Sequence, residues 1–509
     1  MNFWIVLKKL RLNPSDIFNN DFQKNELKTT VVKGSFALII SQGTSFALSM
    51  ISAVVLARLL TPYDFGIIGM VTVFLNFLFI FKDIGLAHAT IQKDEINSSQ
   101  ISTLFWINGI ISISLGVILV ASSPLVAMFY EQPELIAVMS ALSIPFILEG
   151  FAIQHNALLR RHFKFTSLAV IDITSRIIHL VVAIIMAVLG YSYWSLVGGS
   201  IARSVVLLLL TYTTCPWIPG RMKRGAGVRG MLKFGGHVTI GHFMAYLASN
   251  LDKILIGKVM GAAQLGLYNK AHHLLIVPLS QIKLPLTNLS LPVLSSLKHE
   301  SARYQSYFNK LLDISITVAL PLCVYSFIES EFLILLILGP QWVEAGQIFK
   351  ILAVGGIFVS LSYLPSLVML SHGYSKRYMQ LSIATAIITS VSFAIGVFFG
   401  INGIAAAFSI GSFLVLIPMY IVSFRGTPMK LGAVFQTIIW PLLSAAATGL
   451  AIYIIIRTYS VDSIVDHLLI GLVFFIVYTG LTLLRAETRK TLKSIWVSII
   501  SKRKSDKKA

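Results

Sequence analysis

Long apolar runs alternate with short polar segments along this chain of 509 residues. An α-helix needs roughly 20 apolar residues to cross a bilayer, and runs near this length recur from residue 34 to residue 484. The pattern predicts an all-α polytopic membrane protein with 14 transmembrane helices. We expect these helices at 34–57, 65–84, 101–121, 134–154, 166–189, 193–214, 233–256, 265–285, 307–328, 345–370, 376–399, 401–424, 433–456 and 466–484.

The composition supports this assignment. Hydrophobic residues make up 56% of the chain and charged residues 12%, whereas a soluble domain carries about 25% charged residues. The mean hydropathy is +0.81 over the whole length. One buried core cannot hold so many apolar residues, because single cores stop growing near roughly 250 to 300 residues. Most of the protein is therefore expected in lipid.

The positive charge predicts an orientation in the membrane. The chain has 41 Lys and Arg against 21 Asp and Glu, a formal net charge of +20. Basic residues of membrane proteins gather in cytoplasmic loops, and most of those in this chain lie in the two terminal segments and in every second loop. We therefore expect both termini in the cytoplasm and no nucleic-acid partner.

Part of the chain recurs at an offset of 200 residues. The matched residues are Lys33 with Lys233, Arg58 with Lys258, and Gly66 with Gly266. Six predicted spans separate the copies, so both copies enter the membrane in the same direction. This arrangement predicts two lobes of six helices related by a parallel pseudo-two-fold repeat. The expected segments are a cytoplasmic N-terminal segment (1–32), an N-lobe (33–214), a basic cytoplasmic linker (215–232), a C-lobe (233–424), two C-terminal helices (425–485) and a basic cytoplasmic tail (486–509).

Several ionisable residues fall inside the predicted spans, where a charge marks a functional site by default. Asp172 and Arg176 have the i,i+4 spacing that places two side chains on one helix face. Arg203 has no acid near it in sequence, and it lies ~15 Å deep at 1.5 Å per residue. Two arginines at this depth predict a cavity for an anion, because guanidinium groups match phosphate oxygens. The alternative is that both arginines make structural bonds to the backbone or to Asp172.

Three lysines are further candidates. Lys270, Lys283 and Lys350 lie near the ends of their predicted spans, where a long side chain can also extend to the lipid headgroups. Asp172 and Asp252 are candidates for ion coupling, and for Asp252 an ion pair or a role at the helix end is the alternative.

Other motifs are absent. The chain contains no Walker A, His-Glu-x-x-His or Gly-x-Ser-x-Gly sequence, and the GAGVRG segment at 225–230 lacks the preceding strand that a dinucleotide site requires. Cys215 and Cys323 have neither CxxC spacing nor a nearby histidine cluster. We expect no enzymatic activity, no cofactor and no metal site.

Two segments resemble a known family. The ARLLTPYDFG turn at 57–66 and the stretch from LDKILIG to GLYNKA at 251–271 resemble the polysaccharide (O-antigen and exopolysaccharide, Wzx-like) flippases of the multidrug/oligosaccharidyl-lipid/polysaccharide exporter superfamily. The resemblance covers roughly residues 30–485. It implies a protein of the bacterial inner membrane that moves undecaprenyl-pyrophosphate-linked oligosaccharide repeat units across that membrane for lipopolysaccharide O-antigen or exopolysaccharide synthesis. It also implies alternating access between two lobes, a cationic cavity and coupling to an H⁺ or Na⁺ gradient.

The resemblance and the buried charges together give a set of candidate residues. The expected contacts to the pyrophosphate head group are Arg176, Arg203 and Lys270, and the candidates for a gate or cavity wall are Arg58, Lys258, Lys283 and Lys350. The expected partners are the lipid-linked oligosaccharide, membrane lipids, a polysaccharide polymerase and a chain-length regulator. The first span carries charge only at its ends, unlike that of the peptidoglycan-precursor flippases, so such a precursor is a less expected substrate.

Two other functions remain open from sequence. One is an ion-coupled drug or metabolite antiporter of the same superfamily, although such proteins usually depend on an acidic residue in the cavity. The other is a scaffold for glycan assembly that transports nothing, which the basic termini favour and the charges within the spans do not.

Overall fold

The computed structural model describes residues 11–12, 24–83, 86–92, 96–222, 229–459, 461 and 463–490. For residues 24–39, 83, 88–89, 92, 229–245 and 247–249 only the backbone is described. Most of the predicted N-terminal segment and tail, the middle of the predicted linker, and the side chains of Lys33 and Lys233 therefore lie outside the description.

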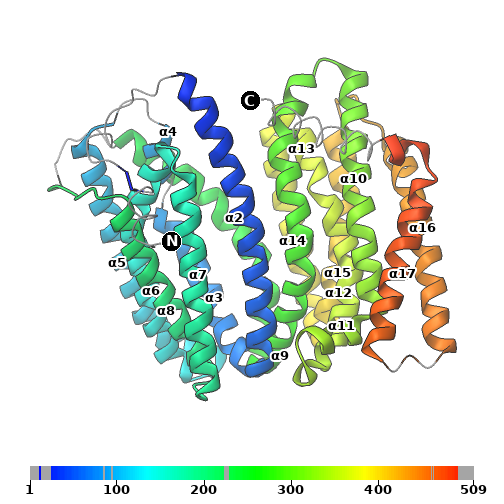
Figure 1. Ribbon diagram of the computed structural model, residues 1–509, viewed down its shortest axis with the longest axis horizontal. Coiled ribbons are helices and arrows are strands. Elements are labelled where there is room, and N and C mark those ends of the chain that lie inside the picture. Colours follow the sequence, from blue (N-terminus) through cyan, green and yellow to red (C-terminus); the bar gives the residue numbers. More distant parts are fainter. Residues whose placement is uncertain are drawn as a thin grey trace. The chain divides into compact units, whose positions relative to one another are not determined.

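Within the described ranges every regular element is a helix (Figure 1). The α-helices are α2 (Lys24–Leu59), α3 (Pro62–Asp83), α4 (Leu86–Gln92), α5 (Ser98–Tyr130), α6 (Glu134–Arg161), α7 (Phe165–Val188), α8 (Trp194–Thr214), α9 (Arg229–Leu297), α10 (Ser301–Ile328), α11 (Ser330–Ile337), α12 (Glu344–Ser362), α13 (Leu364–Ser371), α14 (Ser375–Gly396), α15 (Gly400–Phe424), α16 (Leu431–Thr458) and α17 (Ile464–Leu483). Two 3-10 turns, η2 (Pro340–Trp342) and η3 (Val397–Phe399), complete the described elements.

Twelve helical stretches in the described part of the chain are long and apolar enough to cross a membrane. Two of them, Asn250–Leu297 and Ser375–Phe424, have 48 and 50 residues, about twice the length that one crossing needs. Each contains a glycine with positive φ, Gly261 at 85° and Gly400 at 70°. Helical geometry is interrupted at both glycines, and each lies between two spans that we predicted separately: 233–256 and 265–285, and 376–399 and 401–424. The all-α membrane protein is confirmed, whereas the count of 14 remains a prediction.

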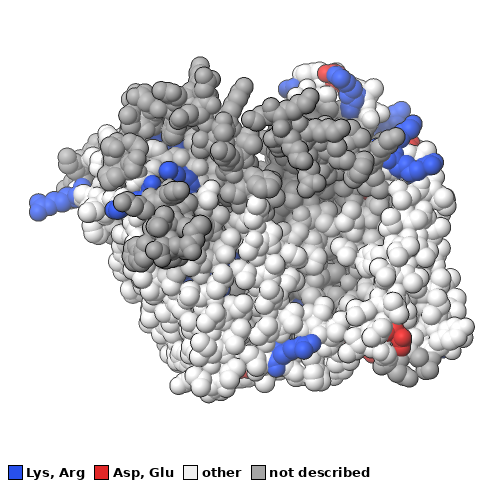
Figure 2. Space-filling model, in the orientation of Figure 1, with Lys and Arg blue, Asp and Glu red and all other residues white. Residues whose placement is uncertain are grey.

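The surface agrees with lipid contact. On the face in Figure 2 the charged side chains lie mostly toward the ends of the helices, and uncharged residues cover the surface between those ends. Large apolar side chains are exposed on these helices, among them Val117 at 60%, Ile454 at 54% and Leu472 at 58%. Such exposure is costly in water and favourable against acyl chains.

The chain forms two compact units, Met1–Gly266 and Leu267–Ala509. The boundary falls inside α9, whereas we predicted a lobe boundary in the linker 215–232. In the first unit α7 packs on α8, α5 on α6, α2 on α7 and α6 on α8. In the second unit α12 and α14 pack on α15, and α10 packs on α12 and α16. The predicted six-helix lobes and their repeat stay predictions.

A hydrophobic cluster in the first unit joins distant parts of the chain. Leu12 is 2% exposed and packs with Ile101, Leu158, Ile171 and Trp217. The Leu12 amide donates a hydrogen bond of 2.9 Å to the carbonyl of Thr214.

The turn between α2 and α3 is fixed by a buried carboxylate. Asp64 is 3% exposed and accepts hydrogen bonds from the Thr61 amide at 2.8 Å and the Thr61 hydroxyl at 2.7 Å. The Ser192 hydroxyl also donates to Asp64. The Asp64 amide donates back to the Thr61 hydroxyl at 3.3 Å, so Thr61 caps the start of α3 and Asp64 completes a capping box.

Beside this turn, the start of α3 and the middle of α9 approach each other at backbone distance. A Cβ atom added to Gly66 would lie 1.7 Å from the carbonyl oxygen of Ala262, and one added to Gly266 would lie 1.8 Å from that of Pro62. No side chain fits at either glycine without a backbone shift.

In the second unit, α17 is joined to the end of α10 by a contact between a histidine and a carboxylate. The His467 Nδ1 lies 3.0 Å from Glu329, whose side chain is 4% exposed. The imidazole also stacks on Phe332, with ring centroids 4.1 Å apart.

Candidate functional site

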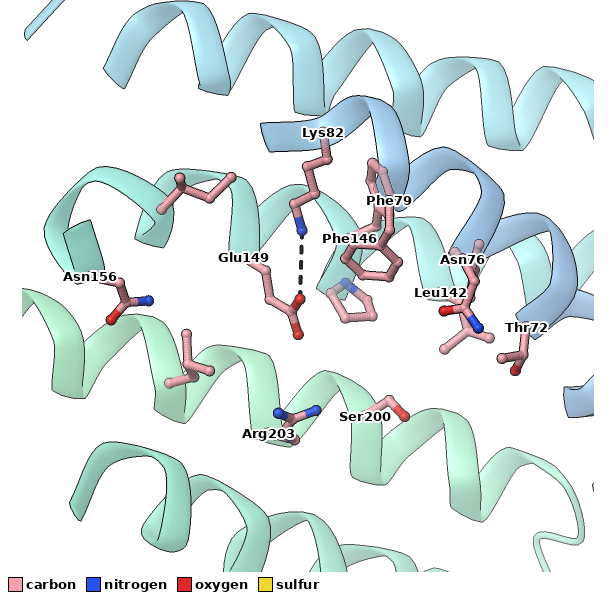
Figure 3. Close-up of a pocket in the computed structure, with 14 residues that line it drawn as sticks. Thr72, Asn76, Phe79, Lys82, Leu142, Phe146, Glu149, Asn156, Ser200 and Arg203 are labelled. Carbon is pink, nitrogen blue, oxygen red and sulfur yellow. Dashed lines mark ion pairs between the residues drawn. The ribbon is translucent and has the colours of Figure 1, made fainter. Parts of the chain in front are cut away.

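Three helices of the first unit enclose a cavity of about 570 Å³ (Figure 3). Its walls carry several polar side chains although the helices around it are apolar. These are Thr72, Asn76 and Lys82 on α3, Glu149 and Asn156 on α6, and Ser200 and Arg203 on α8. The volume lies within the range of small-molecule sites, roughly 300 to 1,000 Å³.

The most buried charge in the cavity wall is Lys82. Its side chain is 4% exposed, and its Nζ lies 3.5 Å from the Glu149 carboxylate. The same ammonium lies 4.5 Å from the centre of the Phe79 ring and 4.7 Å from that of Phe146. Both distances are within the roughly 6 Å of a cation–π contact. The rings and the carboxylate together hold a cation inside the membrane region.

Our sequence analysis missed Lys82. The residue lies at the end of a predicted span, where a lysine normally extends to the headgroups, and its partner is far away along the chain. The signal was in Glu149, an acid within the span 134–154 that has no basic residue three or four positions away. An unpaired acid at that depth predicts a basic partner on a neighbouring helix.

The two predicted arginines meet at one carboxylate. The Arg176 Nε donates a hydrogen bond of 2.9 Å to Asp172, and an Arg203 Nη lies 3.8 Å from the other oxygen of Asp172. The Ser45 hydroxyl also donates to Asp172, at 2.9 Å. The expected i,i+4 pair is thus confirmed, and Asp172 supplies the acid that Arg203 lacks in sequence.

Arg203 connects this cluster with the cavity. It lines the cavity wall, and in Figure 3 its guanidinium faces Glu149 from the opposite side. Its Nε is buried and has no hydrogen-bond partner within the described structure. The side chain is 34% exposed, so a ligand in the cavity can reach the guanidinium.

Lys258 lies apart from the cavity. Its Nζ is 2.8 Å from the Glu131 carboxylate and 5.6 Å from the centre of the Phe129 ring. The hydrogen bond from Lys258 lowers the pKa of Glu131 below its ordinary value. Arg58, the residue matched to Lys258 in the repeat, is exposed near the end of α2.

The remaining candidates occupy separate places. Asp252 is buried in α9, in the first unit. Lys270, Lys283 and Lys350 belong to the second unit. Lys283 lies 6.0 Å from the centre of the Tyr363 ring, and Lys350 lies 5.3 Å from that of Phe327.

Among the described residues no group of three His, Cys, Asp or Glu side chains has the geometry of a metal site. Cys215 and Cys323 are both buried. Burial raises the pKa of the Cys215 thiol to about 12, and a protonated thiol is a poor nucleophile.

With this geometry established, comparison with known proteins identifies the family. A family model described as polysaccharide biosynthesis protein matches residues 55–347, more than half of the chain. The chain belongs to this family. The resemblance seen in the two sequence segments is confirmed.

Three relatives of this polysaccharide biosynthesis protein come from different bacteria. The chain is 27% identical to the teichuronic acid biosynthesis protein TuaB of Bacillus subtilis, over 73% of this chain and 77% of that one. It is 23% identical to the lipopolysaccharide biosynthesis protein WzxC of Escherichia coli, over 66% and 68%. It is 22% identical to the succinoglycan biosynthesis transport protein ExoT of Rhizobium meliloti, over 72% and 74%.

Two solved structures share the fold. The lipid II flippase MurJ, in an inward closed conformation, has a TM-score of 0.69 at 12% identity, over 89% of this chain and 99% of that one. An inward-facing MATE family multidrug transporter has a TM-score of 0.59 at 14% identity, over 75% and 94%. Where the names of these proteins state an activity, it is transport or lipid flipping. The prediction of a membrane transporter related to polysaccharide synthesis, rather than an enzyme, is confirmed at this level.

Proposed function

We propose that this protein moves an oligosaccharide linked to a polyprenyl pyrophosphate from the cytoplasmic to the outer leaflet of the bacterial inner membrane. The single observation that carries the proposal is the cavity of the first unit, in which Lys82 and Arg203 present positive charge between membrane-spanning helices. The polysaccharide relatives TuaB, WzxC and ExoT and the fold of the flippase MurJ support the same function.

The energetic argument concerns the head group. A charged side chain at mid-bilayer costs roughly 3 kcal/mol on insertion scales. Cations at that depth are therefore expected to have a function. A pyrophosphate that bridges a prenyl chain and a sugar carries about two negative charges and cannot cross hydrocarbon alone. Arginine and lysine donors replace the water around its oxygens. The prenyl chain itself can stay in the lipid throughout.

The uncharged polar residues suit the sugar. Asn76, Asn156 and Ser200 line the same cavity, and their amide and hydroxyl groups both donate and accept hydrogen bonds. The cavity walls also include the Phe79 and Phe146 rings. A hydrated glycan needs such partners when it leaves water, since an unmade hydrogen bond costs about 1–3 kcal/mol.

The transport cycle that we propose is alternating access between two six-helix lobes in a chain of 14 spans with both termini in the cytoplasm. Lys270 of the second unit is proposed as a further contact to the head group, and Arg58, Lys258, Lys283 and Lys350 as parts of the gates or cavity wall. Coupling to an H⁺ or Na⁺ gradient supplies the free energy. A polymerase and a chain-length regulator are the proposed partners that use the translocated unit.

The test is a flipping assay in proteoliposomes that contain the full chain and a polyprenyl-pyrophosphate oligosaccharide with a fluorescent sugar. An impermeant lectin or quencher outside reports the fraction of sugar that has crossed, with and without an imposed ion gradient. We expect crossing with the wild type and at least a ten-fold slower rate with Arg176→Ala/Arg203→Ala. Arg303→Ala is the matched control, because this arginine is 75% exposed outside the cavity.

The outcomes separate clearly. If the wild type moves no labelled lipid under any gradient, the proposal is wrong. If the double variant transports at the wild-type rate at equal protein amounts, the cationic cavity is not the path of the head group.

A second function is favoured by one observation, the MATE-like fold at a TM-score of 0.59. In this alternative the protein exchanges ions for a cationic drug or metabolite. The cavity walls argue against it, because they hold two cations and one acid, Glu149. Efflux of a cationic dye from cells, lost with Glu149→Gln and kept with Arg203→Ala, would support the alternative.

A further inference from the structure

We propose that a hollow on the first unit binds one anionic glycerophospholipid of the bilayer, with its phosphate at Arg221 and an acyl chain along α5. The hollow has a volume of about 500 Å³. It lies between α5 and the segment that follows α8, and it is lined by Trp106, Ile110, Pro219, Gly220, Arg221 and Met222. It shares no lining residue with the cavity between α3, α6 and α8. The inference therefore does not depend on what the protein transports.

The segment after α8 is held against the first unit by hydrogen bonds. The Gly220 amide donates a hydrogen bond of 2.9 Å to the Ser102 hydroxyl, and the Gly220 carbonyl accepts one of 2.8 Å from the Trp106 indole. Nearer to α8, Trp217 is 5% exposed, and its carbonyl oxygen lies 3.1 Å from the His155 Nε2. The walls of the hollow are therefore formed by the fold itself.

One apolar face of α5 leads from the hollow along the helix. The i, i+4, i+7, i+11 spacing of a helix face is occupied by Trp106, Ile110, Ile113 and Val117. Their exposed fractions are 39%, 53%, 44% and 60%. At 1.5 Å per residue this face is about 16 Å long, which is close to half of the ~30 Å hydrocarbon core. One acyl chain of a phospholipid spans half of the bilayer, so its length matches this face.

The position of the hollow along α5 matches the edge of the hydrocarbon. Helix α5 has 33 residues and is about 50 Å long, so a bilayer centred on it leaves roughly six residues outside the core at each end. Trp106 follows the first residue, Ser98, by two helical turns and lies near this edge, where tryptophan is enriched in membrane proteins. Arg221 lines the same hollow, at the level of the phospholipid phosphates. With the orientation that we propose, this is the cytoplasmic leaflet.

Arg221 supplies the cation for the phosphate. The residue is exposed, and within the described structure its side chain has no ion pair or hydrogen bond. A guanidinium can bind phosphate oxygens through two parallel hydrogen bonds. The Trp106 indole N–H is already bonded to Gly220, so the phosphate contact falls to Arg221. Basic residues at the cytoplasmic surface attract lipids with a net negative charge.

A soluble protein fits this surface less well than a lipid. The hollow continues onto a face of a membrane-spanning helix, where Ile110 and Val117 are exposed. A soluble partner reaches only the part outside the hydrocarbon. A phospholipid fills both parts, because its phosphate and its acyl chain are joined in one molecule.

The experiment measures the binding of single lipids to the full chain by native mass spectrometry in detergent, after removal of co-purified lipid. The probes are dioleoyl phosphatidylglycerol, which is anionic, and dioleoyl phosphatidylcholine, which has the same chains and no net charge. We expect the first phosphatidylglycerol to bind the wild type about ten-fold more tightly than phosphatidylcholine. Phosphatidylglycerol with a photoreactive diazirine in one chain should crosslink to the α5 peptide that contains Ile110 and Val117.

Two variants change the charge at exposed positions, so that the fold is expected to persist. Arg221→Gln removes the cation and should abolish most of the preference for phosphatidylglycerol, with binding of phosphatidylcholine unchanged. Met222→Glu, at a side chain that is 51% exposed, places a negative charge beside the phosphate and should weaken phosphatidylglycerol at least as much. Arg303→Gln is the matched control, because it also removes one positive charge, at a side chain that is 75% exposed and outside the hollow.

The inference is overturned if the wild type binds both lipids alike. It is also overturned if Arg221→Gln and Arg303→Gln lose the preference to the same extent, since the overall charge of +20 would then be its cause. Displacement of the lipid by an equal concentration of soluble glycerol phosphate would show that the acyl chain contributes nothing, and crosslinks outside α5 would place the lipid elsewhere. Both results contradict the proposed site. None of these measurements involves transport, so their failure is distinct from a failure of the flipping assay.

Discussion

Gly66 and Gly266 approach each other at backbone distance. Gly66 also faces Ala262, four positions before Gly266, and Gly266 faces Pro62, four positions before Gly66. A Cβ on Gly266 would lie 3.1 Å from the Gly66 nitrogen and 1.8 Å from the Pro62 oxygen, and a Cβ on Gly66 would lie 1.7 Å from the Ala262 oxygen. The repeat offset of 200 residues relates Pro62 to Ala262 and Gly66 to Gly266, so the two parts of this contact correspond to each other. Gly66 faces Ala262, and the residues that correspond to these two, Gly266 and Pro62, face each other as well. Such reciprocal contacts are typical of a two-fold axis. The reciprocity supports the proposed repeat.

The first prediction concerns this crossing. Gly66→Ala and Gly266→Ala should each destabilise the protein by about 1–3 kcal/mol, because the backbone must shift to admit a methyl group. Thermal unfolding followed by intrinsic fluorescence in detergent measures the effect. Gly432→Ala is the control, since no atom lies within 4 Å of a Cβ at that position. An unchanged melting temperature for both crossing variants would show that the close approach is not kept in solution.

The second prediction concerns the carboxylate between the arginines. Asp172→Asn leaves Arg176 and Arg203 facing each other without a counter-charge, and should cost about 1–3 kcal/mol at these partly exposed positions. Asp172→Asn/Arg176→Gln removes one of the two cations and should recover much of that loss. Unfolding free energies of the single and double variants form a double-mutant cycle. Additive losses would mean that Asp172 and Arg176 do not interact.

The third prediction concerns the tie between α17 and α10. Glu329→Ala leaves His467 without the carboxylate that it contacts at 3.0 Å, and should destabilise the second unit by about 1–3 kcal/mol, the cost of a buried polar group left without its hydrogen-bond partner. His467→Phe keeps a ring for stacking on Phe332 and should cost less. Hydrogen exchange of α17 amides locates the loosened helix. Equal protection of α17 in Glu329→Ala and in the control Glu344→Ala would contradict the prediction.

The fourth prediction concerns pH. Because Lys258 lowers the pKa of Glu131 below its ordinary value of 4.5, their contact stabilises the protein above that value and is lost as the pH falls through the lowered pKa. Lys258→Gln should return the pKa of Glu131 toward 4.5. Carboxyl carbon NMR shifts during a pH titration measure it, with Glu131→Gln to assign the resonance. A high salt concentration should have the same direction of effect in the wild type, since the carboxylate is exposed. If the Glu131 shift titrates alike in the wild type and in Lys258→Gln, the contact is not formed in solution.

The sequence predicted the helices well for a physical reason. A membrane span must be apolar along its whole length and must satisfy its own backbone, so its position can be read without any knowledge of its neighbours. The i,i+4 pair of Asp172 and Arg176 was predicted for the same reason, since both partners lie on one helix. The backbone breaks at Gly261 and Gly400 fall between spans that were predicted separately, 233–256 and 265–285, and 376–399 and 401–424.

The cavity could be predicted only in part. Arg203 stood out by its depth, but Asp172 as its partner and the pairing of Lys82 with Glu149 depend on how α3, α6, α7 and α8 pack. Those contacts join residues 31 and 67 positions apart, and local periodicity carries no information about them. The position of the Phe79 and Phe146 rings beside Lys82 depends on the same packing.

The buried Leu12 sets an order on the synthesis of the protein. Its amide bonds to Thr214 and its side chain packs with Trp217, so this early residue has no place to dock until some 200 further residues have left the ribosome. At ~5–20 residues per second, that interval is roughly 10–40 s. During this time the backbone and side-chain partners of Leu12 near residues 214–217 have not yet been made, so Leu12 docks only after the helices between them.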